Sequence, residues 1–155
     1  MCMTRFNNNN RRDGISAETD KLSSELFGDA LDLLALGEEI GVLLVIEDDQ
    51  GNIASYELAD DGPEALIDEA YTRIKEINHH GGDKEAGLGM PIRYAIAYEG
   101  AIAADDDSYQ DALLLEFGEK GYKSYSAYSY VKGRGKGNDF QWTEPAPAGE
   151  VEPLL

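Results

Sequence analysis

Four carboxylate side chains in the second half of the chain are spaced as the ligands of a divalent cation are. They are Asp105, Asp107, Asp111 and Glu116. Counted from the first, they fall at positions one, three, seven and twelve, which is the ligand spacing of a calcium-binding loop. Ca²⁺ and Mg²⁺ prefer such oxygen ligands, so these residues are the candidate metal site. They support one hypothesis for the function, a divalent-metal-dependent hydrolase.

The same loop departs from the calcium pattern at two positions. Gln110 stands where the calcium loop needs glycine for its sharp turn, and Tyr109 replaces one of its oxygen ligands. The flanking residues alternate as strands do, whereas a calcium loop of this kind lies between helices. We therefore expect no bound cofactor and, at most, weak binding of a divalent cation.

Residues suited to covalent catalysis are few. A nucleophile needs an adjacent base, but the only histidines are the neighbours His79 and His80, whose side chains we expect to diverge. The only cysteine, Cys2, provides neither a disulfide framework nor a thiolate cluster for zinc. The sequence therefore favours a non-catalytic protein in a reducing compartment.

Basic and aromatic side chains near the end of the chain are candidates for binding a partner. Residues 132–138 form a basic, glycine-rich island, in which an arginine could grip paired carboxylate or phosphate oxygens. Tyrosines alternate along the segment before it and offer rigid contact area on one face, although one row of them could instead pack beneath a helix. The predicted partner-binding residues are Lys132, Arg134, Lys136, Tyr125, Tyr128, Tyr130 and Trp142.

The chain is strongly acidic, with 31 acidic and 13 basic residues and a net charge of −18. A surface this negative repels phosphates and anionic lipid, which argues against direct binding of nucleic acid or membrane. It attracts a basic protein partner, could mimic DNA and so inhibit a DNA-binding protein, or could serve solubility alone. Because no apolar run is long enough for a signal peptide or a membrane span, we expect a cytoplasmic protein.

The first half of the chain predicts two helices around a hairpin. Apolar residues recur at spacings of three and four in residues 19–36 and again in residues 63–80, where a proline begins the pattern and a glycine pair ends it. Between them, the apolar segments 42–47 and 52–58 flank a turn rich in Asp and Gly, which is typical of a β-hairpin. A glycine-rich loop follows the second helix.

The second half predicts strands, because its apolar residues recur with a period of two. We expect strands over residues 91–98, 112–117 and 122–131, and an edge strand over residues 139–143. The element order α-β-β-α-β-β-β-(β), with short turns between the last strands, predicts an α+β fold. Its sheet should be mostly antiparallel with five or six strands, and both helices should pack on one face.

One folded domain is expected, over residues 16–142. Residues 1–15 contain a run of asparagines with little to bury, so we expect a disordered N-terminal arm. Residues 143–155 are acidic and rich in proline, so we expect a tail.

The element order resembles that of roadblock, longin and profilin-like modules. Those modules place a hairpin, a helix and a three-stranded meander in one central sheet. The resemblance covers the order of elements from the first helix to the third strand of the meander and implies a fold, not an activity. The sequence thus favours a protein-interaction or regulatory module that acts through an exposed sheet face, with a homodimer as one way to cover the tyrosines.

Overall fold

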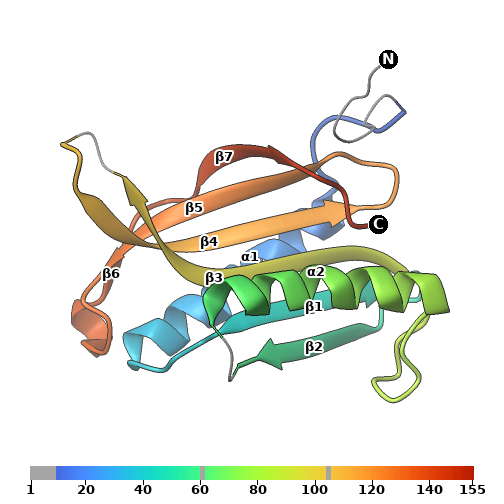
Figure 1. The fold of residues 1–155 in the computed structure, drawn as a ribbon, viewed down its shortest axis with the longest axis horizontal. Helices are drawn as coiled ribbons and strands as arrows, with labels where there is room; N and C mark the ends of the chain where they lie inside the picture. The colour runs from blue at the N-terminus through green and yellow to red at the C-terminus, as the bar shows by residue number, and fades with distance from the viewer. Residues whose placement is uncertain (1–9, 60–61, 104–105) are drawn as a thin grey trace.

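The computed structural model describes residues 10–59, 62–103 and 106–155. Its helices are α1 (Ala17–Ala35) and α2 (Pro63–His80), and a short 3-10 helix, η1, spans Gly137–Asp139. The strands are β1 (Val42–Asp48), β2 (Ile53–Leu58), β3 (Pro91–Ala103), β4 (Tyr109–Glu119), β5 (Ser124–Lys132), β6 (Gln141–Trp142) and β7 (Ala146–Val151). The predicted α+β class, element order and antiparallel pairing are confirmed (Figure 1).

All strands belong to one curled antiparallel sheet in the order β2-β1-β3-β4-β5-β6. Strand β7 pairs with the same edge of β5 as β6, further toward the start of β5. The hairpin β1–β2 and the meander β3–β4–β5 therefore share the sheet, as the resemblance in element order implies. No helix in the described residues is both long and apolar enough to cross a membrane.

The two helices lie on opposite faces of the sheet, so the prediction that they share one face is wrong (Figure 1). Helix α1 packs on the face that carries Leu43, Ala95 and Leu113. Helix α2 packs on the face that carries Leu44 and Ile96. Strands β1 and β3 have apolar residues at consecutive positions, so both faces of the central sheet need a cover.

Local signals explain where each helix begins and ends. The Ser16 side chain caps α1 by accepting a hydrogen bond of 3.1 Å from the Thr19 N–H. Helix α2 begins at Pro63, whose missing N–H is no loss in the first turn. It ends at Gly81, which takes the left-handed conformation (φ 76°) that glycine adopts most readily.

The C-terminal residues are part of the fold, which corrects the prediction of a tail from residue 143. Strand β7 pairs with residues 124–128 of β5. After it, Leu154 is buried with Tyr94 in the core beneath α2. The prolines misled the prediction, because proline is tolerated on an edge strand, where half of the N–H groups have no partner strand.

The predicted N-terminal arm is only partly within the described residues, since residues 1–9 lie outside them. The last part of that arm contacts the domain. Arg12 pairs with the β4–β5 turn through main-chain hydrogen bonds to Gly121 and Lys123. The Arg11 guanidinium donates to the main-chain oxygens of Tyr122 and Leu155, at 3.0 Å and 2.7 Å.

A buried carboxylate joins the β1–β2 turn to the loop before β3. Asp48 is 1% exposed. It accepts hydrogen bonds from the N–H groups of Gln50, Asn52 and Gly89 and from the Asn52 amide, at 2.7–3.0 Å. Burial acts to raise the pKa of Asp48, but these hydrogen bonds outweigh it and lower the pKa to about 2.

Replacing this carboxylate should destabilise the protein in a pH-dependent way. In Asp48→Asn, an amide NH₂ would face donors, which should cost about 1–3 kcal/mol of unfolding free energy at pH 7. Because the folded pKa of about 2 lies below the ordinary 3.8, the carboxylate stabilises the fold fully above about pH 4 and loses its effect as the pH falls toward 2. Urea unfolding between pH 2 and 7 should show the two proteins converging at low pH, whereas Asp49→Asn, at an exposed neighbour, should track the parent throughout.

Truncating Leu154 should test whether the C-terminus belongs to the core. Leu154→Ala should lower the unfolding free energy by about 2 kcal/mol, because the side chain is 8% exposed and packs against the α2 side of the sheet. Leu36→Ala is the matched control, since Leu36 is 72% exposed and should change stability by about 0.5 kcal/mol or less. Equal denaturation curves for the two variants would show that the C-terminus is a tail after all.

Candidate binding groove

Strands β3 and β4 extend beyond their neighbours as a two-stranded arm. The pairing of β1 with β3 ends at Val42↔Tyr98, and the pairing of β4 with β5 ends at Ala112↔Tyr130. Beyond these limits, residues 101–103 of β3 remain in register with residues 109–111 of β4. The arm projects at one end of the molecule, above the turn that leads from β5 to β6 (Figure 1).

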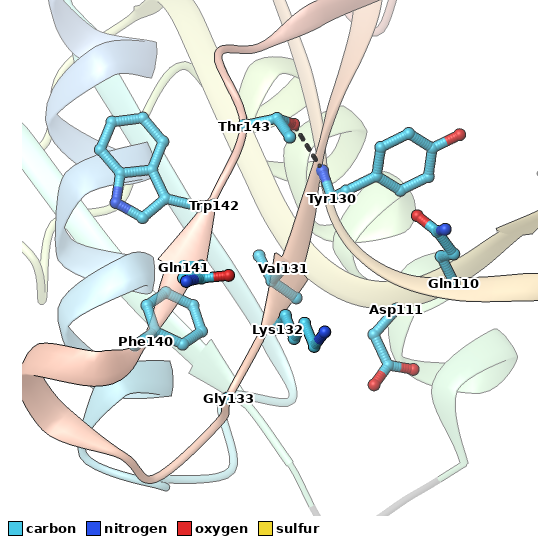
Figure 2. A pocket seen from close by; sticks show the side chains of 10 residues that line it. All are labelled: Gln110, Asp111, Tyr130, Val131, Lys132, Gly133, Phe140, Gln141, Trp142 and Thr143. Atoms are coloured by element: carbon cyan, nitrogen blue, oxygen red, sulfur yellow. Dashed lines mark hydrogen bonds between the residues drawn. The ribbon is translucent and has the colours of Figure 1, made fainter.

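An open groove of about 840 Å³ lies where β5 separates from this arm. Figure 2 shows Gln110 and Asp111 on its β4 side and three residues of the β6 segment on the other. The lining residues are Gln110, Asp111, Tyr130, Val131, Lys132, Gly133, Phe140, Gln141, Trp142 and Thr143. Polar and apolar side chains are thus combined in one concave surface, as ligand sites require.

The aromatic wall of the groove is held in place by helix α1. The Trp142 ring packs edge-on against Phe27 of α1, with ring centroids 5.7 Å apart and planes at 81°. Phe140 is half-buried against the apolar core between α1 and the sheet. Trp142 still exposes 47% of its surface, so its ring is fixed in position and accessible to a ligand.

Two hydrogen bonds hold β6 beside the end of β5. The Thr143 N–H donates to the Tyr130 carbonyl at 3.0 Å, and the Tyr130 N–H donates to the Thr143 hydroxyl at 2.9 Å (Figure 2). Val131 and Lys132 pair with Trp142 and Gln141. At this point β5 has β6 on one edge and no longer pairs with β4 on the other, and the groove opens where β4 and β5 separate.

The basic island after β5 is anchored to the fold through its arginine. Arg134 donates to the Glu38 carbonyl at 2.7 Å and lies 3.5 Å from the Glu99 carboxylate. The Gly135 N–H donates to the Leu34 carbonyl at the end of α1. Arg134 therefore supports the wall of the groove, while Lys136 is exposed in the same loop and Lys132 lines the groove itself.

The charges around the groove are mostly negative on the side of the arm. Burial raises the pKa of Glu99, and the nearby carboxylates of Asp111 and Glu39 raise it further, against the opposing effect of Arg134. Among the described residues that line the groove, Lys132 is the only one with a cationic side chain. A ligand therefore meets a carboxylate at β4 and a single ammonium group at β5.

The predicted partner-binding tyrosines are divided between two faces of the sheet. Tyr128 and Tyr130 share the α2 face, with their rings 5.3 Å apart and edge to face, and only Tyr130 lines the groove. Tyr125 lies on the α1 face, where its hydroxyl accepts a hydrogen bond from the Gly14 N–H. It lines a separate, mainly apolar cavity beside β7. The groove thus combines Tyr130, Lys132 and Trp142 from the predicted set.

The structure does not bring the predicted metal ligands together. Asp105 lies outside the described residues, and Asp107 is in the exposed turn at the tip of the arm. Asp111 and Glu116 point to opposite faces of β4, because they are five positions apart in a strand of regular register. In the described parts of the chain, no three His, Cys, Asp or Glu side chains are grouped as metal ligands would be.

Glu116 instead joins the second helix to the sheet. Its carboxylate is 6% exposed and accepts hydrogen bonds of 2.7–2.8 Å from the hydroxyls of Tyr71 in α2 and Tyr98 in β3. Burial, followed by these contacts with Glu116, raises the pKa of both tyrosines. Both hydroxyls therefore stay protonated as donors at neutral pH.

The remaining candidates for chemistry lie elsewhere. His79 and His80 are exposed at the end of α2, and their rings pack edge to face 5.4 Å apart instead of diverging. Neither lines the groove. Cys2 lies outside the described residues.

Sequence reasoning missed several residues of the groove. Phe140 and Gln141 lie within the predicted edge strand, but only Trp142 of that segment was assigned to binding. Gln110 and Asp111 were considered only as part of a calcium loop. The missing information was the end of the β4–β5 register, which no local pattern reveals.

No protein-family model, curated protein or solved structure matches the chain. The function therefore has to be inferred from the groove and the surrounding charges.

Removing a tyrosine hydroxyl from Glu116 should measure how much that contact stabilises α2. Tyr71→Phe should lower the unfolding free energy by about 1–3 kcal/mol, because a buried carboxylate loses one of its two donors. Tyr109→Phe is the matched control, since Tyr109 is 74% exposed on the arm. Chemical denaturation should separate the two variants, and indistinguishable midpoints would show that the Tyr71 contact contributes nothing.

Proposed function

We propose that this protein is a non-catalytic binding module that takes up a basic segment of another protein in the groove between the arm and β6. The observation that supports this most is an open groove of about 840 Å³ that is lined both by the fixed, half-exposed ring of Trp142 and by the carboxylate of Asp111. Aromatic rings and carboxylates are the groups that bind lysine and arginine side chains.

The charge of the whole chain favours the same class of partner. At a net charge of −18, a basic protein is attracted over a long range, which accelerates its association at low salt. On the arm, Asp106, Asp107 and Asp111 continue this negative surface to the edge of the groove. Lys132 on the opposite wall is suited to a carbonyl or carboxylate of the bound segment.

The groups in the groove suit binding better than catalysis. Of the described residues that line it, Asp111 is the only carboxylate, and none is a histidine or a cysteine. General acid–base work usually pairs two titratable groups around the reacting atoms. The lining instead offers hydrogen-bonding amides, hydroxyls and aromatic contact area, which fix the position of a ligand.

Selection from a random peptide library displayed on phage tests the proposal. The full chain should enrich peptides rich in lysine and arginine. Because Trp142 is the only tryptophan, its fluorescence should change on titration with a synthetic copy of a selected peptide. Trp142→Leu and Asp111→Asn, each checked for an unchanged melting temperature, should each weaken binding about tenfold or more, as an anisotropy titration of the labelled peptide would measure.

A matched control lies on the same surface outside the groove. Lys136→Ala removes an exposed charge from the loop before β6 and should leave peptide binding within about twofold. Selection of no peptide, or of peptides that bind Trp142→Leu and Asp111→Asn as well as the parent, would contradict the proposal. A decoy for a DNA-binding protein acts through its overall charge, so it would bind basic peptides equally well with Trp142 or Asp111 replaced. Its binding would also weaken steeply as salt is raised.

A further inference from the structure

The arm presents some main-chain groups that are not in register with any of the described strands on the β5 side. In antiparallel pairs, both main-chain groups of a residue point to the same side, and consecutive residues point to opposite sides. The Lys120 N–H donates to the Ile92 carbonyl at 2.9 Å, which places the main chain of even-numbered β4 residues toward β3. Odd-numbered residues, including Tyr109 and Asp111, therefore direct their main chain toward the β5 side.

At this position β5 is no longer paired with β4. The last pair of the two strands is Ala112↔Tyr130, and because Ala112 directs its main chain toward β3, this pair is closed by the Val131 N–H donating to the Asp111 carbonyl. The Asp111 N–H and the main chain of Tyr109 have no aligned partner on the β5 side among the described strands. The groove occupies this space, with Gln110 and Asp111 on one side and Val131 and Lys132 on the other. The N–H groups of Asp111, which lines the groove, and of Tyr109, which lies next to the lining residue Gln110, therefore point to the β5 side of the arm.

This short free edge is also flanked by surfaces for side chains. Side chains of an added strand would alternate between the two faces of the sheet. On the α1 face, the strand would find the carboxylate of Asp111, which shares that face with Leu113. On the α2 face, it would find Gln110 and the ring of Tyr130.

We infer that the partner segment binds as an added β-strand, pairing with the free edge of β4 at residues 109–111. The inference rests on the proposed function and specifies how the segment is held. Main-chain hydrogen bonds supply affinity in this mode, while alternate side chains supply specificity. The segment is extended and has lysine or arginine at alternate positions, because only every second side chain can reach the α1 face and Asp111.

A pair of substitutions at one position separates main-chain from side-chain binding. Tyr109→Pro removes the N–H that points to the β5 side of the arm, and Tyr109→Ala removes only the side chain. The probe is an octapeptide of alternating lysine and valine with blocked ends, titrated by Trp142 fluorescence. Tyr109→Pro should weaken binding at least tenfold more than Tyr109→Ala, with both variants keeping the melting temperature of the parent within a few degrees.

The complementary change is made in the probe. Two octapeptides with the same sequence carry N-methyl groups on alternate residues, one on the odd and one on the even positions, so that each has one edge blocked. One methylated peptide should lose at least tenfold in affinity relative to the other. Amide exchange followed by NMR should show slower exchange at Tyr109 and Asp111 in the complex with the unmethylated peptide.

The outcomes distinguish this inference from the proposed function. If the octapeptide changes Trp142 fluorescence but both methylated forms bind equally well, or Tyr109→Pro binds like Tyr109→Ala, strand addition is wrong and the groove remains a binding site. If amide protection appears instead along β2 or β7, the segment adds to another edge, and the inference is wrong. If the octapeptide does not bind while selected basic peptides do, alternate basic side chains on an extended strand are not what the groove recognises. If no basic peptide binds, the inference and the proposed function both fail.

Discussion

Burial of the central strands on both faces is the constraint on which the rest of the structure depends. Strands β1 and β3 carry apolar side chains at consecutive positions, so the sheet cannot leave either face to water. Helix α1 fits closely where Ala95 and Ala97 present small side chains, and α2 covers the bulkier Tyr94 and Ile96. With one helix on each face, the α1 face can also support the aromatic wall of the groove through Phe27.

The elements were predictable from local patterns, whereas their arrangement was only partly so. Helical spacing, a proline at the start of α2 and a glycine at its end define the helices, and alternation defines the strands. The continuous apolar run at the start of β1 already indicated a strand buried on both faces, but the prediction placed both helices on one face. Strand β7 was missed because its proline and glycine residues were taken to indicate a tail, although an edge strand tolerates them.

The candidate site was less predictable, because it depends on where pairing ends. Spacing placed Asp111 and Glu116 in one metal site, yet strand geometry directs them to opposite faces. Tyr130, Lys132 and Trp142 were recognised as binding residues, but as parts of a sheet face and a loop. Only the separation of β5 from β4 after Tyr130, together with the pairing of β6, brings them into one groove with Asp111, and these pairings are non-local.

The burial of Leu154 bears on the order in which the two faces of the sheet can close during synthesis. The α1 side draws its buried residues from positions 22–127, whereas the α2 side includes a residue from position 154. A nascent chain can therefore cover one side of the sheet while the other still exposes part of the surface around Tyr94. Such an intermediate carries apolar area next to unpaired strand edges, the combination that chaperones recognise and that favours aggregation.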